Sequence, residues 1–300
     1  MKEKPSYFQV KEIINLEFDE KGQYSYIKLK KRNLNTLQAL KIISDKLRIP
    51  LKQIGFAGNK DKRAITTQYI SIPRISKDKI EKINSNKIRL TFLGYGNKRI
   101  NLGSSLGNKF KIKFENKLKK IYFCENYFDD QRFGINNNNH LLGKLILENK
   151  FNELKSLVTL PENSRELKIQ LRFYLNAYQS YLFNLVLSEY LKKFNHKKIS
   201  YSLGELTFIE KKIKNFKIPL VNFDTVLKGE IGRIYKKILK KENIKLDSFL
   251  VKSNPFLISD TQYRDAFFDV KDLVQKDKVI YFSLPKGSYA TILLKKLENT

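Results

Sequence analysis

The stretch FAGNKDKRAITTQYISI, residues 56–72, places a short charged loop between two β-rich segments. The loop carries one acid, Asp61, among the bases Lys60, Lys62 and Arg63. Basic clusters normally bind phosphate, and a carboxylate within such a cluster repels that ligand. Asp61 is therefore expected to have a functional role. The alternative is that Gly, Asn and Asp occur in this loop only because they favour turns. From this loop alone, a nucleophilic carboxylate and a plain hairpin turn both remain open.

The residues around this loop predict an α+β arrangement. Apolar and polar residues alternate from Phe8 to Phe18, from Gln23 to Leu29 and from Thr67 to Ile72, as they do in strands. Leucine and isoleucine recur at helical spacing over Thr36–Leu47, with Asn35 or Thr36 as the N-terminal cap. Further strands are predicted at Ile88–Leu93 and Phe110–Phe114, helices near Leu141–Asn149, Ser164–Phe194 and Glu230–Lys241, and strands again over residues 278–297. This order indicates an insertion within an α+β domain.

The charge of the chain points to a polyanionic partner. Its 300 residues carry a formal net charge of +29, from 59 Lys and Arg against 30 Asp and Glu. Nucleic acid is the leading candidate, because neutralising its phosphates releases counterions. Base-composition drift in an AT-rich genome is an alternative, since Lys far outnumbers Arg. Drift alone does not halve the acids, so the composition predicts nucleic-acid binding.

Several classes of chemistry lack their motifs. The sequence has no P-loop, no GxGxxG after a strand and few adjacent carboxylates. Cys124 is the single cysteine, and His140 and His196 lie far apart, which argues against a metal centre. The first residues lack an apolar signal core, and no run approaches the roughly 20 apolar residues of a membrane span. We therefore expect a cytoplasmic protein, as a monomer, with no membrane partner and neither a metal nor an organic cofactor.

Two later stretches offer groups that suit a nucleobase. In NYFDDQRFG, residues 126–134, Asn126 has the donor and acceptor that match the edge of uracil, and Phe128 offers a stacking face. Arg132 either binds a phosphate or braces the acidic pair beside it. In PKGSYAT, residues 285–291, a glycine turn precedes Tyr289, which suits contact with a base. Taken singly, these aromatics are more typical of core packing, and the second stretch is more typical of an ordinary β-turn.

Taken together, five segments in order resemble the motifs of the TruD family of tRNA pseudouridine synthases. They are KPSYFQVKE (4–12), like the opening segment; GNKDKRAITTQ (58–68), like the nucleophile motif; NYFDDQRFG (126–134); LNAYQSYLFN (175–184), like a helical signature; and LPKGSYAT (284–291). The resemblance runs from Lys4 to Leu297 and is weakest over residues 190–275.

The resemblance implies a fold and a division into domains. The expected class is α+β: the pseudouridine synthase fold, with a mixed, mostly antiparallel sheet flanked by helices and an inserted α/β TRUD domain. The catalytic domain is expected at residues 1–154 and 276–300, and the inserted domain at residues 155–275.

The resemblance also assigns roles to individual residues. Asp61 falls on the catalytic nucleophile, and Lys2 falls on a basic residue near the active site of the family. The residues expected around the target uridine are Phe8, Asn126, Phe128 and Tyr289, with Lys60 and Arg132 expected to bind the RNA beside it. The family's bacterial members carry Phe where this chain has Tyr289, so the ring is shared and the hydroxyl is not.

The sequence thus predicts an enzyme that isomerises a uridine in tRNA, at position 13, to pseudouridine after flipping the base out of its stack. A non-catalytic RNA-binding protein or RNA chaperone on the same scaffold is the alternative. A methyltransferase is a third reading. An acid within a basic site argues against pure binding, and the lack of a glycine-rich loop for adenosylmethionine argues against methylation.

Overall fold

A computed structural model describes residues 7–60 and 64–299, which form two compact units. The first comprises residues 1–122 and 269–287, and the second residues 123–268 and 288–300. The units are defined by packing, and their limits differ from the predicted catalytic and inserted domains. That functional division, with the insertion at residues 155–275, stays a prediction.

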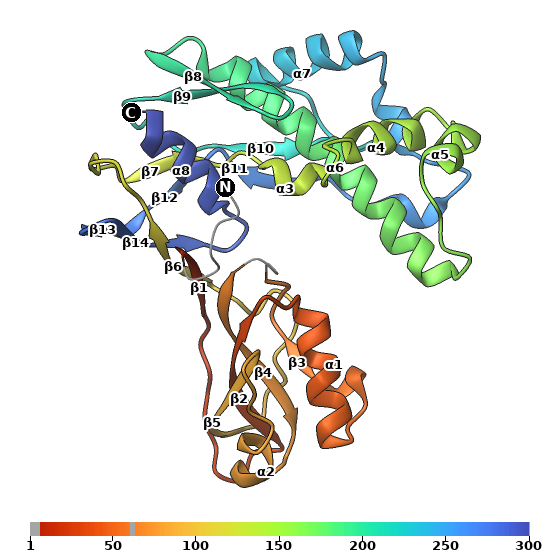
Figure 1. Ribbon diagram of the computed structural model, residues 1–300. Helices are drawn as coiled ribbons and strands as arrows, with labels where there is room; N and C mark the ends of the chain where they lie inside the picture. Colours follow the sequence, from red (N-terminus) through yellow and green to blue (C-terminus); the bar gives the residue numbers. More distant parts are fainter. Residues whose placement is uncertain (1–6, 61–63, 300) are drawn as a thin grey trace. The chain divides into compact units, whose positions relative to one another are not determined.

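The described part of the first unit is built on an eight-stranded sheet (Figure 1). The strands are β1 (Phe8–Ile13), β2 (Tyr24–Arg32), β3 (Gly55–Phe56), β4 (Ile65–Pro73), β5 (Ile88–Gly96), β6 (Gly107–Lys113), β13 (Lys271–Lys276) and β14 (Val279–Pro285). They lie in the order β13-β14-β6-β1-β4-β2-β5, and β3 pairs with β4. Strands β1 and β4 run parallel, and the other pairs are antiparallel. The predicted mixed, mostly antiparallel sheet is confirmed.

One face of this sheet is covered by α1 (Thr36–Leu47) and α2 (Lys77–Glu81). Leu40 and Ile43 of α1 are buried against Ile27 and Leu29 of β2, which turn to this face because side chains alternate along a strand. Asn35 caps α1 as predicted: its side chain accepts from the backbone N–H of Gln38 at 2.7 Å. Such a cap satisfies an N–H group that the helix itself leaves free.

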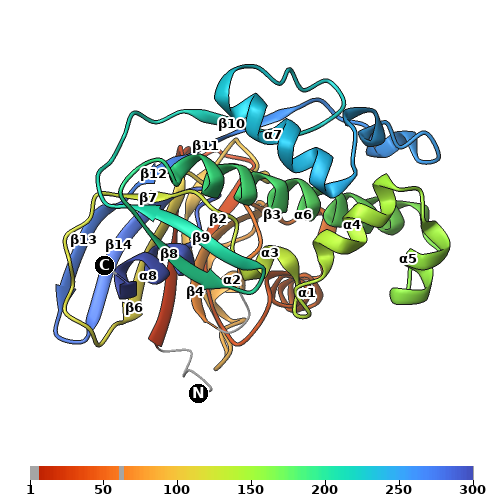
Figure 2. The same cartoon turned by 90° about the horizontal axis from the view of Figure 1, so that it is seen from above.

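The second unit is organised around the long helix α6 (Ser164–Leu191), beside which lie α4, α7 and the strands β9 and β10 (Figure 2). Its other helices are α3 (Asp130–Phe133), α4 (Asn139–Leu147), α5 (Phe151–Leu157), α7 (Gly229–Glu242) and α8 (Ala290–Asn299). Three strand pairs complete it: β7 (Phe123–Glu125) with β12 (Phe267–Asp269), β8 (His196–Tyr201) with β9 (Gly204–Ile209), and β10 (Lys217–Leu220) with β11 (Gln262–Asp265). Short 3-10 turns occur at Leu51–Gln53, Leu246–Phe249 and Pro255–Leu257.

The closing stretch corrects one prediction. Residues 278–297 were expected to be strands throughout, but the chain leaves β14 at Pro285 and forms α8 over Ala290–Asn299. Ile292, Leu293, Lys296 and Leu297 are buried, and this i, i+1, i+4, i+5 spacing places them on one face of a helix. Within the described residues, no helix combines the length and the apolar character needed to cross a membrane.

Candidate active site

In the first unit, Lys60 anchors the end of the charged loop to three different elements. Its backbone N–H donates to Thr36 Oγ1 at 2.9 Å, and its carbonyl accepts from Lys31 Nζ at 3.2 Å. Its own ammonium donates to Glu12 Oε1 at 2.6 Å. Asp61, like Lys62 and Arg63, lies outside the described residues. The structure therefore fixes the residue before Asp61 and describes nothing of Asp61 itself.

The ion pair of Lys60 is buried. The Glu12 side chain is 0% exposed and that of Lys60 is 10% exposed. The second carboxylate oxygen of Glu12 accepts from the backbone N–H of Tyr69 at 3.0 Å. Burial raises the pKa of Tyr69, and the nearby Glu12 charge raises it further. The ammonium of Lys60 is thus paired with a buried carboxylate, and the binding of RNA by Lys60 stays a prediction.

Phe8 belongs to the same unit. It lies on β1, half-buried, with its ring edge-to-face against Phe110 at a centroid distance of 6.2 Å. Phe110 in turn stacks on Phe282 at 5.1 Å. Lys2 lies outside the described residues, so Phe8 and Lys60 are the predicted site residues that this unit describes.

The other predicted residues come together in the second unit, around the ring of Phe128. Its backbone is clamped by Asn184 of α6, which accepts from the Phe128 N–H at 2.9 Å and donates to its carbonyl at 2.8 Å. The ring meets Phe183 edge-on at 5.5 Å and Tyr289 at 6.1 Å. Tyr289 is half-buried and directly precedes α8. Segments far apart in the chain thus build one aromatic cluster.

Arg264, which lies outside the five motif segments, completes this cluster. Its guanidinium carbon lies 4.1 Å from the centroid of the Phe128 ring, within cation–π range. It also donates through Nη2 to Asn126 Oδ1 at 2.5 Å and through Nε to the Asn126 carbonyl at 2.8 Å. Burial lowers the pKa of Arg264 to about 10, an effect that Tyr289 opposes and Arg132 reinforces. The guanidinium therefore stays charged at neutral pH.

Asn126 is held in a fixed orientation. Its Nδ2 donates to the carbonyl of Asp265 at 2.9 Å, and its backbone N–H donates to the carbonyl of Ala266 at 2.8 Å. Together with the bond from Arg264 Nη2 to Oδ1, the bond from Nδ2 fixes both ends of the carboxamide of Asn126, a residue that is 8% exposed. The contacts with residues 264–266 thereby determine the positions of Oδ1 and Nδ2 of Asn126.

Arg132 also lies near the Phe128 ring, with its guanidinium carbon 5.4 Å from the ring centroid. Its Nε donates to Ser180 Oγ at 3.0 Å. Burial lowers the pKa of Arg132, and Tyr289 acts in the opposite direction. Of the two roles left open for Arg132, the described ion pairs do not support bracing of the acidic pair, because Lys295 of α8 pairs with Asp129 at 2.9 Å and with Asp130 at 3.3 Å. The binding of RNA by Arg132 stays a prediction.

A buried ion pair joins the strand before Asn126 to the helix after Tyr289. Lys296 Nζ lies 3.0 Å from Glu125 Oε2 and donates to the carbonyl of Ile209 at 3.1 Å. Both side chains are at most 2% exposed. Burial raises the pKa of Glu125, while the charge of Lys296 and the backbone N–H of Ile209 lower it. The pair holds two motif-bearing segments together in the interior.

Comparison with known proteins places this arrangement in a family. A sequence profile described as tRNA pseudouridine synthase D (TruD) matches residues 1–170 and 204–297. The chain belongs to the TruD family. The predicted resemblance is thereby confirmed, although the matched ranges leave out the predicted helical signature at residues 175–184.

Individual TruD proteins match over most of their length. The tRNA pseudouridine synthase D of Aquifex aeolicus (strain VF5) is 31% identical, over 99% of this chain and 97% of that protein. A probable tRNA pseudouridine synthase D of Archaeoglobus fulgidus is 29% identical, over 100% of this chain and 94% of that protein. The crystal structure of a putative TruD from Methanosarcina mazei superposes with a TM-score of 0.69 at 25% identity, covering 100% of this chain and 93% of that one. The predicted fold is confirmed, and the chain is an isomerase of the pseudouridine synthase type.

Two residues of the cluster, Arg264 and Asn184, were not predicted as site residues, because the sequence around them gives little indication of their roles. Arg264 stands in the segment TQYRDAF, where the resemblance to the family was weakest. Its two bonds to Asn126 connect positions 138 residues apart. Asn184 ends the helical signature LNAYQSYLFN, but its partner, Phe128, is 56 residues away. Both roles depend on long-range contacts that no local pattern encodes.

Proposed function

We propose that this chain converts the uridine at position 13 of tRNA to pseudouridine and that Asp61 is the nucleophile. The observation that supports it most is the cluster around Phe128, in which Asn126, Arg264 and Tyr289 meet from three distant segments. In this cluster the half-buried ring of Tyr289 offers an aromatic surface for a flipped base, and Asn126 offers a carboxamide of fixed orientation for its edge.

The proposed reaction rearranges bonds without net oxidation. Asp61 attacks either ribose C1′ or the base, and the N1–C1′ bond breaks. The uracil turns in place, C5 bonds to C1′ and the bond to Asp61 breaks, which frees the carboxylate. C5 then loses its proton, and N1 ends protonated. The product has the same atoms as the substrate, so the proposed chemistry asks for a rigidly held nucleophile and a pocket that retains the detached base.

Within this proposal, Lys60 positions the nucleophile loop. Lys60 was expected to bind RNA, but its buried bond to Glu12 supports a different role. The backbone of Lys60 is held by hydrogen bonds with Thr36 and Lys31. In this proposal these bonds position the chain for the nucleophile that follows.

The proposed function is tested by mapping pseudouridine in tRNA. Unmodified tRNA is incubated with the purified chain, and each position is read by chemical labelling of pseudouridine followed by primer extension. We expect one new pseudouridine, at position 13, and none when that uridine is replaced by cytidine. Pseudouridine only at another position would contradict the site, and none in any of a set of tRNAs would contradict the function.

Replacing Arg264 by Met should lower the turnover of uridine by about 10- to 100-fold, because a hydrogen bond to a charged group contributes about 1.5–3 kcal/mol. The methionine keeps the apolar contact with Phe128 but no longer fixes the Asn126 carboxamide. Single-turnover kinetics at saturating enzyme would measure this, alongside the Kd for tRNA.

The exposed residue Arg233 on α7 supplies the matched control. Arg233→Met removes the same charge and should leave the rate unchanged. A positioning role for Arg264 requires that the rate constant falls while the Kd stays within a few-fold. Wild-type turnover in a folded Arg264→Met protein would show that Asn126 needs no such support.

A further inference from the structure

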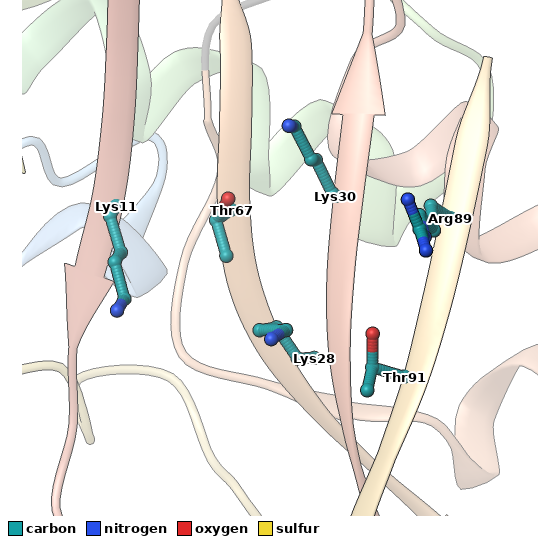
Figure 3. A pocket seen from close by; sticks show the side chains of 6 residues that line it. All are labelled: Lys11, Lys28, Lys30, Thr67, Arg89 and Thr91. Carbon is teal, nitrogen blue, oxygen red and sulfur yellow. The ribbon is translucent and has the colours of Figure 1, made fainter. Parts of the chain in front are cut away.

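The open face of the first unit's sheet carries a cluster of cationic and hydroxyl side chains. Six of them line a shallow hollow across four neighbouring strands (Figure 3): Lys11, Lys28, Lys30, Thr67, Arg89 and Thr91. Lys11, Lys30 and Arg89 are exposed, and the other three are partly exposed. We call these six residues the cationic sheet face.

Strand pairing arranges four of these residues in one row. Lys11 of β1 lies opposite Thr67 of β4, Thr67 lies opposite Lys30 of β2, and Lys30 lies opposite Arg89 of β5. Neighbouring strands are about 4.8 Å apart, so the row spans about 14 Å at the level of the backbone. The pair Lys28 and Thr91 forms the next row along the same strands.

The row continues beyond β1. Lys11 lies opposite the exposed Lys109 of β6, and Lys109 lies opposite Ser283 of β14. Basic residues alternate with buried aromatic and aliphatic ones along β6, as in FKIKF at residues 110–114. Positive charge therefore crosses the sheet from β6 to β5.

This face is opposite the one that holds Glu12. Successive side chains on a strand point to opposite sides of the sheet, so Lys11 points away from Glu12, the buried partner of Lys60. Leu29 beside Lys28 and Lys30 is likewise buried against α1. The cationic sheet face is thus distinct from the surface that anchors the nucleophile loop.

The described part of the chain pairs no acid with the charges on this face. Like charges placed directly across from each other destabilise a sheet, and both Lys30–Arg89 and Lys11–Lys109 are such pairs. Among residues 7–60 and 64–299, no carboxylate lies within 4 Å of the amino or guanidino groups of Lys11, Lys28, Lys30 or Arg89. A polyanion laid across the strands would relieve this repulsion.

We propose that the cationic sheet face binds the phosphate backbone of the RNA substrate, at a distance along the RNA from the uridine that reacts. The proposal rests on the proposed function for the identity of the polyanion. Lysine and arginine neutralise phosphates, and hydroxyl groups such as those of Thr67 and Thr91 donate to phosphate oxygens. These contacts read no base, so they add affinity and orientation without sequence preference.

A triple variant, Lys11→Gln/Lys30→Gln/Arg89→Gln, tests this face through the salt dependence of tRNA binding. Each lost phosphate contact lowers the slope of log K against log salt by about 1, so the slope should fall by about 2 to 3. At moderate salt the Kd for tRNA should rise about tenfold. The rate constant at saturating enzyme should stay unchanged, because the substituted groups do not belong to the proposed reaction site.

The matched control is Lys77→Gln/Lys79→Gln/Lys82→Gln, which removes the same charge from exposed positions on and beside α2. It should leave the salt slope unchanged. An equal fall of the salt slope in both triple variants would overturn the proposal. Wild-type tRNA binding by Lys11→Gln/Lys30→Gln/Arg89→Gln would also overturn it, and would indicate an acidic protein as the partner of this face. Binding is measured without turnover, so failure of the wild-type chain to form pseudouridine would contradict the proposed function and not this surface.

Discussion

An Asp61→Asn variant is expected to form no measurable pseudouridine in tRNA, while its Kd for tRNA stays within a few-fold of the wild-type value. The carboxamide keeps the size of the side chain but is neutral and a poor nucleophile. Loss of a nucleophile in other enzymes lowers turnover by about 10⁴-fold or more. Binding should survive, because removing one acid from a basic loop weakens no phosphate contact.

Two further variants sharpen this result. Asp78→Asn removes the same charge from an exposed position on α2 and should turn over normally. Asp61→Glu keeps the charge but moves the carboxylate by one methylene, so it should show strongly reduced but measurable activity. Release of tritium from C5-labelled tRNA measures all three variants on one scale. Normal turnover by Asp61→Asn would remove Asp61 from the mechanism.

The fold was predictable wherever one local pattern dominates. The cap at Asn35 and the alternation along β2 and β4 identify their elements directly, because the buried face of each element recurs with the period of its backbone. The last helix was not predictable in this way. In SYATILLKKL the run of apolar residues fits either a buried strand or a short helix, and only packing distinguishes the two.

The candidate site was predictable in its motifs and not in its contacts. The basic cluster around Asp61 predicts phosphate ligands. Lys60, however, forms an ion pair with Glu12, which is 48 positions away in the sequence. Arg132 stands beside the acidic pair in sequence, yet Lys295 reaches it from the far end of the chain. In each case the ion-pair partner is determined by the tertiary fold, which brings together charged residues that are far apart in the sequence.

Replacing Lys296 by Met should lower the free energy of unfolding by about 3–5 kcal/mol at neutral pH. The substitution leaves the Glu125 carboxylate buried without its cation, and a single remaining charge in the interior is strongly destabilising. Replacing both partners, as Glu125→Gln/Lys296→Met, should recover most of the loss, because neither side chain is then charged. Lys192→Met breaks the exposed pair with Glu189 and should change stability by less than about 1 kcal/mol.

The loss in Lys296→Met should also depend on pH in a defined direction. Burial already raises the pKa of Glu125, and Lys296 opposes that rise, so removing Lys296 raises the pKa further. A carboxyl group whose pKa is higher in the folded state binds its proton more readily there, and the folded state loses stability as pH rises through that pKa. The deficit of the variant should therefore shrink as pH falls from 8 towards 5. Urea unfolding of the variant and of the wild type at both pH values measures it. A deficit that is constant across this range would mean that the loss comes from packing around residue 296 and not from the charge of Glu125.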